Sequence, residues 1–385
     1  MDKIYMDHAA TTPVRSEVLD AMLPYFSSEF GNASSVYGWG RQAHHALDEA
    51  RDTVAGLLGA AANEIIFTSG GSEGANLAIK GVAWAYQTKG KHIITSAIEH
   101  HAVLDTTLWL KKQGFEVTVL PVDEDGLVSP ALVAEALRPE TILVSIMHAN
   151  NEVGTIQPIS EIGAIVRQHG AFFHTDAVQT AGVLDLNVEA LNVDLLSLSA
   201  HKLYGPKGVG ALYCRKGVRL DPLIHGGAQE RRRRAGTENV AGIVGLATAL
   251  VLARQEQEAE NKRLTTLRDR LLEGLQKISA TRVNGSLVNR LPNNVNVCFQ
   301  YIEGESMLLN LDLKGVAASS GSACTSGSLD PSHVLLAMGL THEIAHGSLR
   351  LTLGRSNTEA EVDFVLQEVP IIVERLRQMS PLYQA

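Results

Sequence analysis

A cysteine near the end of this 385-residue chain lies in a segment that favours reactivity over burial. Cys324 stands within Ser319–Ser328, whose sequence SSGSACTSGS contains no large apolar side chain. Cysteine usually packs in a protein core as a small hydrophobe. A run of serine and glycine instead predicts an exposed loop, on which a thiolate can reach out and react.

A second segment, Ser69–Asn76 (SGGSEGAN), has the composition of a phosphate-binding turn. It joins the apolar run Glu64–Thr68 to a helical pattern from about Ala75 to Tyr86. Small residues at such a junction let backbone N–H groups face an anion, which the helix dipole also attracts. The spacing matches neither the Walker nor the dinucleotide pattern, so nucleotide binding is disfavoured. An ordinary strand-to-helix turn is the alternative.

Two further residues, Asp176 and Lys202, could bind a cofactor or take part in a reaction. Both follow predicted strands. Asp176 lies in HTDAVQ, where a carboxylate could hold a protonated ring nitrogen or could simply cap a helix. Lys202 lies in SLSAHKLYGPKG, where a dry cleft would lower the lysine pKa and permit a Schiff base. A solvated lysine is the alternative. A phosphate cradle, an acid for a ring nitrogen and a Schiff-base lysine together describe a pyridoxal phosphate site.

The remaining cysteines and the histidines give little support for a metal site. Cys214 and Cys298 stand in apolar, strand-like runs and are predicted to lie in the core. His342 and His346 are four residues apart but have no third ligand nearby, so no permanent metal site is expected. His100 and His201 follow predicted strands inside the proposed site.

The elements that must position these residues alternate in type along the chain. The predicted strands are Glu64–Thr68, His92–Ser96, Phe115–Leu120, Thr141–Met147, Ala171–His174, Asp194–Ser199 and Val209–Tyr213. Apolar strands separated by helices predict a mostly parallel sheet with helices on both faces. In such sheets ligands bind outside the carboxyl ends of the strands, where all of these polar motifs fall.

The length of the chain favours two domains. A long helical pattern over Ala241–Ile278 is interpreted as the bridge between them. The predicted limits are 14–257 for a large cofactor-binding domain, and 1–13 with 258–385 for a small domain. The small domain is expected to contain strands near Asn294–Phe299 and Ser348–Thr352 and a final helix over Thr358–Gln378.

The composition narrows the class of protein and its setting. The net charge of −9 argues against nucleic acid or an anionic membrane as a partner. Three cysteines form no disulfide framework, which favours a reducing compartment. No apolar run has the length of a signal peptide or a membrane span, so a cytoplasmic protein is expected.

Together these segments resemble a known family over nearly the whole chain. The chain is similar to fold-type I pyridoxal phosphate enzymes of the class-V aminotransferase group and, within it, to cysteine desulfurases of the NifS/IscS type. The segments that carry the resemblance are YMDHAATTP (5–13), FGNASS (30–35), EH (99–100), HANNEVG (148–154), HTDAVQ (174–179), SAHK (199–202), RAGTEN (234–239) and the Cys324 segment. The resemblance implies an α/β fold, with a seven-stranded sheet between helices and a smaller α+β domain.

The resemblance also implies a cofactor site for pyridoxal 5'-phosphate. The implied contacts are Gly71, Ser72, His100, Asn151, Asp176, Gln179, Ser199, His201, Lys202 and Thr237. Lys202 would form the Schiff base and later carry protons, and Asp176 would pair with the ring nitrogen. Gln179 would bond the phenolic oxygen, and His100 would stack on the ring as an acid–base group. Thr237 would reach the phosphate of a partner subunit, which implies a homodimer.

The implied substrate is L-cysteine, with Asn32, Asn151 and Arg350 as substrate contacts and Lys202, His100 and Cys324 as catalytic residues. Cys324 would take the sulfur as a persulfide, leave L-alanine, and pass the sulfur to an acceptor such as an iron–sulfur scaffold protein. It could also hold an iron–sulfur cluster transiently, although no other ligand set supports this.

Two departures from the family pattern, Ala228 and Arg232, stand where glycine is usual in GGAQERRRR (226–234). If either position needs a positive φ, its Cβ costs free energy and affects how Thr237 is presented. Two other functions compete with desulfuration. An aminotransferase or selenocysteine lyase would use the same lysine and aspartate, whereas a sulfur-carrier scaffold would form no Schiff base.

Overall fold

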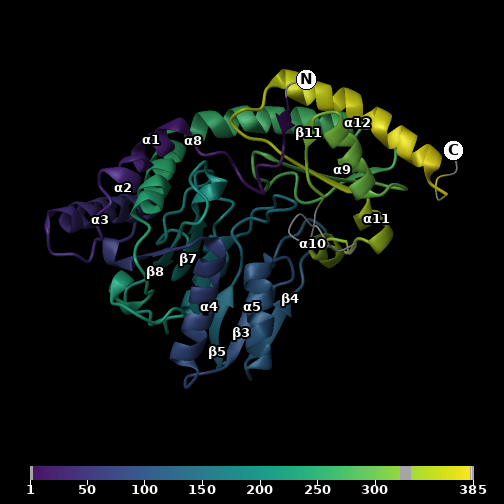
Figure 1. Ribbon diagram of the computed structural model, residues 1–385. Coiled ribbons are helices and arrows are strands. Elements are labelled where there is room, and N and C mark those ends of the chain that lie inside the picture. The colour runs from purple at the N-terminus through teal and green to yellow at the C-terminus, as the bar shows by residue number, and fades with distance from the viewer. Residues whose placement is uncertain (1–2, 321–330, 382, 384–385) are drawn as a thin grey trace.

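The computed structural model describes residues 3–320, 331–381 and 383. The chain forms a large α/β part and a smaller part of helices and short strands (Figure 1). Helix α8 (Val240–Leu275) runs from one part to the other along the top of this view. It matches the predicted bridge over Ala241–Ile278 closely. The domain limits themselves remain a prediction.

The large part is built on one sheet with the strand order β2-β8-β7-β6-β5-β3-β4. Its strands are β2 (Ile65–Thr68), β3 (His92–Ser96), β4 (Glu116–Leu120), β5 (Thr141–Ser145), β6 (Phe172–Asp176), β7 (Leu195–Ser199) and β8 (Gly210–Cys214). Strand β8 is antiparallel to both neighbours, and the other neighbouring pairs are parallel. The prediction of a mostly parallel sheet is therefore confirmed.

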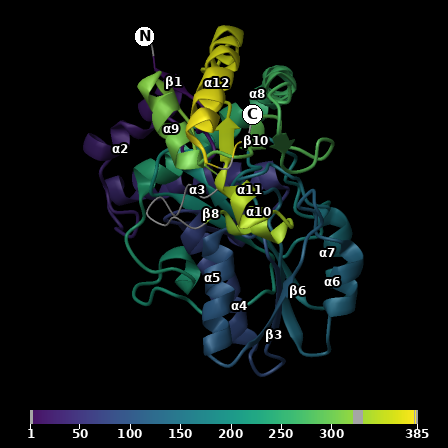
Figure 2. The same cartoon turned by 90° about the vertical axis from the view of Figure 1, so that its right-hand side faces the viewer.

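Helices cover both faces of this sheet, which is why its central strands are apolar without alternation. Figure 2 shows α4 (Gly71–Tyr86) and α5 (His101–Lys112) on one side of the strands and α6 (Pro130–Ala136) and α7 (Ile159–His169) on the other. Every residue of β3, β5 and β7 is buried. The other elements of this part are α1 (Ser16–Met22), α2 (Pro24–Ser27), α3 (Gly38–Leu58) and the 3-10 helices η1 (Ala62–Glu64), η2 (Ala200–Lys202) and η3 (Gln229–Arg232).

The small part contains an antiparallel sheet with the strand order β12-β10-β9 and a parallel pair of β1 with β11. These strands are β1 (Ile4–Tyr5), β9 (Thr281–Val283), β10 (Asn294–Phe299), β11 (Val316–Ala317) and β12 (Ser348–Thr352). Its helices are α9 (Gly304–Leu313), α10 (His333–Ala337), α11 (His342–His346) and α12 (Glu359–Met379). The pairing of β1 with β11 brings the N-terminal segment into the small part.

The second half of α8 supplies the core of the small part. Leu264, Leu267, Leu271 and Leu275 recur every three or four residues and are all buried against β10, β12 and α12. This spacing places them on one face of the helix. Full burial of each such side chain stabilises the folded state by roughly 1.5–3 kcal/mol relative to leaving it exposed to water. This packing holds α8 rigidly to the small part.

The end of strand β6 and the burial of two cysteines can be compared with the sequence predictions. Asp176 is the last residue of β6, whereas the predicted strand ended at His174. Cys214 and Cys298 are 1% and 0% exposed, which confirms that both lie in the core. Within the described residues, no helix has the length and apolar character needed to span a membrane.

Candidate active site

Most of the predicted site residues surround one cavity of about 350 Å³ at the carboxyl ends of the strands. The predicted residues that line it are Gly71, Ser72, His100, Asn151, Asp176, Gln179, Ser199, His201, Lys202 and Arg350. They come from the ends of β2, β3, β5, β6 and β7, and from β12 of the small part. The fold thus brings together residues that are up to 279 positions apart, from Gly71 to Arg350.

Two predicted residues, Asn32 and Thr237, do not line this cavity. Asn32 is exposed and lies in a separate hollow with Phe30 and Trp39. Thr237 is exposed on the segment that leads into α8. Cys324 lies outside the described residues.

Lys202 follows β7 in the 3-10 helix η2, and the N-terminal segment lies against it. Its Nζ donates hydrogen bonds to the backbone oxygens of Ala9 at 2.6 Å and Ala10 at 2.7 Å. Gln179 Nε2 donates to the same Ala9 oxygen at 3.1 Å. The lysine and the glutamine therefore both point to one wall of the cavity, formed by residues at the start of the chain.

Asp176 and His100 form the electrostatic centre of the cavity. Asp176 is 8% exposed, and burial raises the pKa of its carboxyl, opposed by His100, by a hydrogen bond from Val178 N and by Lys202. Burial also lowers the pKa of His100, opposed by Asp176. Backbone Ala102 N donates to His100 Nδ1 at 3.1 Å, so the neutral ring carries its hydrogen on Nε2. A buried carboxylate that faces a cavity suits a protonated ring nitrogen.

The turn before α4 leaves backbone N–H groups uncapped and packs closely at Gly71, as a phosphate cradle requires. Gly70, the N-cap of α4, provides no side-chain hydrogen bond, so the first-turn N–H groups have no capping partner there. A Cβ added to Gly71 would lie 2.6 Å from Val178 Cγ2. Only glycine leaves this space open, and open N–H groups at a helix start bind anions.

His201 lies in the same wall. Its Nδ1 is 3.2 Å from Thr11 Oγ1, and burial lowers the pKa of the ring to about 4, with smaller contributions from Lys202 and Lys207. The ring is therefore neutral at pH 7. It can donate one hydrogen bond to an anion but adds no charge.

Arg350 reaches the cavity from strand β12 and is 2% exposed. Its Nη1 donates to the Asn151 backbone oxygen at 3.1 Å, and its Nη2 donates to Asp7 Oδ1 at 2.9 Å. Its Nε is buried and has no hydrogen-bond partner among the residues that the structure describes. A buried guanidinium with an unsatisfied N–H at a cavity is well suited to a carboxylate ligand.

No role in the site was predicted for Asp7, Ala9 or Ala10, although they lie in the YMDHAATTP segment (5–13) of the family resemblance. Asp7 orients Arg350 across 343 positions, and the backbone oxygens of the two alanines bind Lys202. The only signal was the proximity of a carboxylate to an otherwise apolar N-terminal strand. A backbone acceptor cannot be identified from the sequence, because every residue has a carbonyl oxygen.

The two departures from the family pattern differ in their backbone cost. Ala228 has φ −87°, so its Cβ costs nothing. Arg232 has φ +66°, and Glu230 and Arg231 also lie in the left-handed region. Such a residue costs roughly 1 kcal/mol when it is not glycine. The buried ion pair between Glu230 and Arg51, with two contacts of 2.7 Å, holds this conformation in place.

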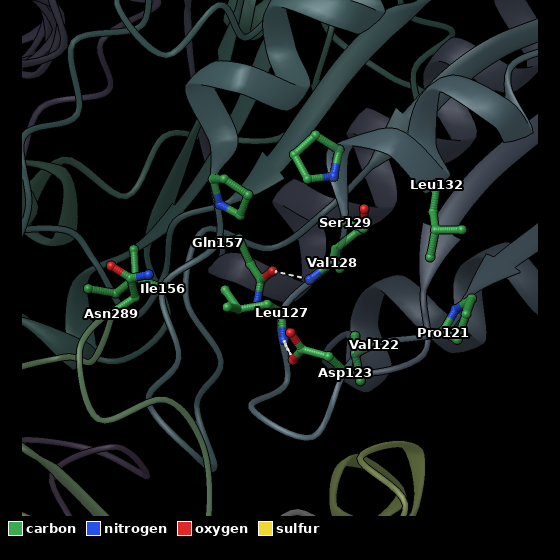
Figure 3. A pocket seen from close by; sticks show the side chains of 12 residues that line it. Pro121, Val122, Asp123, Leu127, Val128, Ser129, Leu132, Ile156, Gln157 and Asn289 are labelled. Atoms are coloured by element: carbon green, nitrogen blue, oxygen red, sulfur yellow. Dashed lines mark hydrogen bonds between the residues drawn. The ribbon is translucent and has the colours of Figure 1, made fainter.

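A separate cavity of about 600 Å³ lies between the loop after β4 and the start of α6 (Figure 3). None of the predicted site residues lines it. Gln157 Oε1 accepts a hydrogen bond from Val128 N at 2.8 Å, and Asp123 Oδ1 accepts one from Leu127 N at 2.8 Å (Figure 3). These polar groups hold the loop itself, so this cavity has no chemistry comparable to that around Lys202.

Over residues 3–320, 331–381 and 383, no three His, Cys, Asp or Glu side chains lie close enough to share a metal ion.

The family of the chain follows from comparison with known proteins. The family model described as aminotransferase class-V matches residues 4–365. The chain belongs to this family. A cysteine desulfurase IscS of Methanosarcina thermophila is 62% identical over 379 residues, covering 98% of this chain and 94% of that protein. Pyridoxal phosphate is the cofactor of the family generally, and the cradle, the buried carboxylate and the lysine described above fit it.

Solved structures agree with this assignment. A structure titled NifS-like protein superimposes with a TM-score of 0.92 at 41% identity, covering 97% of this chain and all of its own. A structure titled SspA in complex with cysteine superimposes with a TM-score of 0.81 at 42% identity, covering 91% of this chain and 98% of its own. The expected α/β fold of the class-V group is therefore confirmed.

Proposed function

We propose that this protein is a cysteine desulfurase, which removes sulfur from L-cysteine, releases L-alanine and retains the sulfur as a persulfide on Cys324. The observation that carries the proposal is the single cavity in which Lys202, Asp176 and His100 meet Arg350. The desulfurase names of relatives more than half identical to this chain, and a related structure with bound cysteine, support it.

The cavity residues divide into those that hold the cofactor and those that move protons. Gly71, Ser72, Ser199 and His201 would bind the phosphate of pyridoxal 5'-phosphate, Asp176 its ring nitrogen and Gln179 its phenolic oxygen. Lys202 would hold the cofactor covalently as a Schiff base. When bound, the cofactor supplies an electron sink that stabilises a carbanion at the Cα of the substrate.

The proton transfers belong to Lys202 and His100. Lys202 Nζ, once released, would take the proton from the substrate Cα and return one to the product. His100 carries its hydrogen on Nε2, because Nδ1 accepts from Ala102 N. Its ring would therefore serve as a neutral hydrogen-bond donor in the cavity. Both residues are held in place by backbone atoms of neighbouring elements.

Substrate selection rests on the carboxylate of the amino acid. Arg350 is fixed by Asn151 O and Asp7, and its unsatisfied Nε would bind the carboxylate together with the side chain of Asn151. The amino acid would then lie between the large and small parts. This geometry suits a free amino acid better than a peptide, because the carboxylate must be free.

The sulfur transfer belongs to Cys324. Its thiolate would bond to the sulfur of the bound cysteine, while the bond from that sulfur to the substrate Cβ breaks. The electron pair of the broken bond remains on the carbon, which takes up a proton and becomes the methyl group of alanine. The protein keeps a persulfide, and no external oxidant is needed. A soft, ionisable nucleophile is required, which a hydroxyl is not.

The protein would act as a homodimer. Phe30, Tyr37 and Trp39 are 64%, 56% and 57% exposed and their rings lie together, an apolar cluster that is unusual on a monomer. A second copy would cover it and would bring Asn32 and Thr237 to the cavity of the partner, where the sequence predicts a substrate contact and a phosphate contact.

The persulfide would pass to an acceptor such as an iron–sulfur scaffold protein. A reducing compartment such as the cytoplasm would keep Cys324 as a thiol between cycles. These two assignments follow the names of the relatives and the scarcity of cysteine in the chain.

The test is the variant Cys324→Ala, measured by sulfide release in the presence of a thiol that reduces the persulfide, and by mass spectrometry of the intact protein after addition of cysteine without that thiol. We expect it to retain the cofactor absorption and its change on adding cysteine, but to lose sulfide release by at least about a hundredfold. The control is Cys214→Ala, a buried cysteine, which should release sulfide normally.

Unchanged sulfide release from Cys324→Ala would contradict the persulfide mechanism. Formation of 3-mercaptopyruvate together with an aminated cofactor, without sulfide, would indicate an aminotransferase. Wild-type protein that stays colourless with pyridoxal phosphate would indicate a scaffold without turnover.

A further inference from the structure

The turn from Asn150 to Gly154 is hydrogen-bonded to the small part of the molecule. The backbone oxygen of Glu152 accepts hydrogen bonds of 3.0 Å from Asn294 Nδ2 and 3.0 Å from Asn296 Nδ2, both on β10. The backbone oxygen of Asn151 accepts the bond from Arg350 on β12. The small sheet is therefore bonded directly to the turn that carries Asn151.

This turn is also fixed internally. Asn150 is 0% exposed, and its Oδ1 accepts hydrogen bonds from Glu152 N at 2.8 Å and Val153 N at 2.9 Å. Its Nδ2 donates to Ile98 O at 2.9 Å. A turn bonded in this way moves as a unit, so a contact made by Glu152 is transmitted to Asn151.

The side chain of Glu152 is buried but does not line the cavity. It is 5% exposed, and its carboxylate accepts a short hydrogen bond from Ser332 Oγ. Burial raises its pKa to about 7, opposed by the Ser332 bond and the charge of Arg350. A buried carboxyl group costs free energy, and here it makes one specific contact across 180 positions of the sequence.

Ser332 fixes the start of helix α10 at the same time. It is 2% exposed, and its Oγ accepts hydrogen bonds from Val334 N at 3.1 Å and Leu335 N at 3.2 Å. The next residue, His333, donates from Nε2 to Glu99 O at 3.0 Å. The beginning of α10 is thus bonded to the large part at two adjacent residues.

The residues on the other side of the Cys324 segment are bonded to Arg350. Ser319 N donates to Arg350 O at 3.1 Å, and Arg350 N donates to Ser319 O at 2.6 Å. Cys324 stands in the sequence between Ser319 and Ser332. One flank is therefore bonded to the strand that carries Arg350, and the other to the turn that carries Asn151.

We propose that Glu152 is a positioning residue, which through Ser332 holds the downstream flank of the Cys324 segment in register with Asn151 and Arg350. This inference rests on the proposed desulfurase function. Glu152 touches neither the cavity nor the reacting atoms, and acts only through the serine and the turn. Its loss should therefore impair sulfur transfer more than the binding of cysteine or of the cofactor.

A purely structural role for Glu152 gives a different expectation. If the Ser332 bond only stabilised the fold, its loss would lower the melting temperature and the cofactor content, while the kcat of the folded fraction would stay normal. The two roles are separated by kcat per bound cofactor and by amide hydrogen exchange at the start of α10.

The variants are Glu152→Ala, Glu152→Gln, Ser332→Ala and the double variant Glu152→Ala/Ser332→Ala. Gln keeps an acceptor oxygen of the same reach, so it should restore the bond to Ser332. The control is Asp194→Asn, which alters another buried carboxylate, at the opposite end of the large sheet.

In the holoenzyme, Glu152→Ala should lower the kcat of sulfide release from L-cysteine about ten- to a hundredfold, as expected for a nucleophile held out of place. The spectral change on binding cysteine should shift by less than threefold in concentration. Val334 and Leu335 amides should exchange faster, Glu152→Gln should behave like the wild type, and the double variant should be no worse than the stronger single variant. Asp194→Asn should leave kcat and this exchange unchanged.

A kcat for Glu152→Ala within twofold of the wild type would overturn the proposal. So would additive losses in the double variant, or a Glu152→Gln variant as impaired as the alanine variant. Wild-type protein that releases no sulfide would overturn the proposed function itself and this inference with it, and is recognised before any variant is made.

Discussion

The two ends of the large sheet use the same kinds of polar residue in opposite ways. At the amino ends of the strands, Asp194 is bonded by Phe173 N and Arg215, and His92 is bonded by Thr141 and Thr118. At the carboxyl ends, Asp176 faces a cavity instead of a fixed arginine.

The two buried carboxylates differ in the groups that compensate their charge, and this difference indicates their roles. Burial raises the pKa of both Asp194 and Asp176. The bonds from Phe173 N and Arg215 compensate Asp194 within the protein, so its contribution is to stability. The groups around Asp176 leave room for a ligand, so the remaining compensation is expected from a bound cation. We therefore expect the compensated carboxylate to stabilise the fold at one end and the uncompensated one to bind a cofactor at the other.

The contrast between the two carboxylates is tested by neutralising each of them in turn. Asp176→Asn should lower desulfurase activity about a thousandfold, because an amide cannot hold a ring nitrogen in its protonated form. It should leave the melting temperature of the cofactor-free protein unchanged or raised, since a buried charge is removed. Activity assays and thermal unfolding of both forms measure this.

Asp194→Asn should show the converse. We expect a loss of about 2 kcal/mol in the free energy of unfolding and normal activity per folded molecule, because a charge-assisted pair is lost far from the cavity. Urea unfolding measures the first quantity. If both variants lost activity to the same extent, the contrast between the two ends would be wrong.

Glycines at the two ends give a second, smaller contrast. Gly71→Ala should weaken cofactor binding about tenfold, because its Cβ would lie 2.6 Å from Val178 Cγ2 and displace the cradle. Gly56 lies in α3, close in sequence to the amino end of β2, with nothing within 4 Å of an added Cβ. Gly56→Ala should therefore raise the free energy of unfolding by about 0.8 kcal/mol without affecting the cofactor.

Titration with pyridoxal phosphate, followed by absorbance, measures both affinities. Equal affinities for the cofactor in the two glycine variants would argue against a phosphate cradle at Gly71.

A last contrast concerns the loop before Thr237, which Glu230 anchors to the edge strand β2. Arg232→Gly should raise the free energy of unfolding by about 1 kcal/mol, because Arg232 has φ +66°. Ala228→Gly should give no gain, because Ala228 has φ −87°. Chemical unfolding distinguishes the two. A larger gain at Ala228 would show that backbone strain does not govern this loop.

Much of the fold could be predicted from the sequence because it depends on local patterns. Runs such as His92–Ser96 and Asp194–Ser199 place apolar residues at adjacent positions instead of alternating them with polar residues, as expected for a strand covered on both faces. Gly71, Asp176 and Lys202 follow three such strands. Because parallel strands end at one edge, their convergence on one cavity could also be predicted.

The limits of the elements and the outer wall of the cavity could not be predicted from the sequence. Asp176 completes β6 instead of following it, because the ladder to β7 extends to Ser197. Asn32 and Thr237 were predicted at the site, yet within one chain neither lines the cavity. In the proposed homodimer their placement would depend on how a second copy packs, which no local pattern encodes.

By itself, the sequence determined the chemistry: a lysine, a carboxylate and a phosphate cradle at strand ends, and a cysteine among small polar residues. Only the tertiary structure decided which distant residues complete the site. Asp7 lies 343 positions from Arg350, and Glu152 lies 180 positions from Ser332. Periodicity and turn composition report on neighbours along the chain, whereas these pairs form only when the β1–β11 pairing and the packing of α8 bring the small part against the large one.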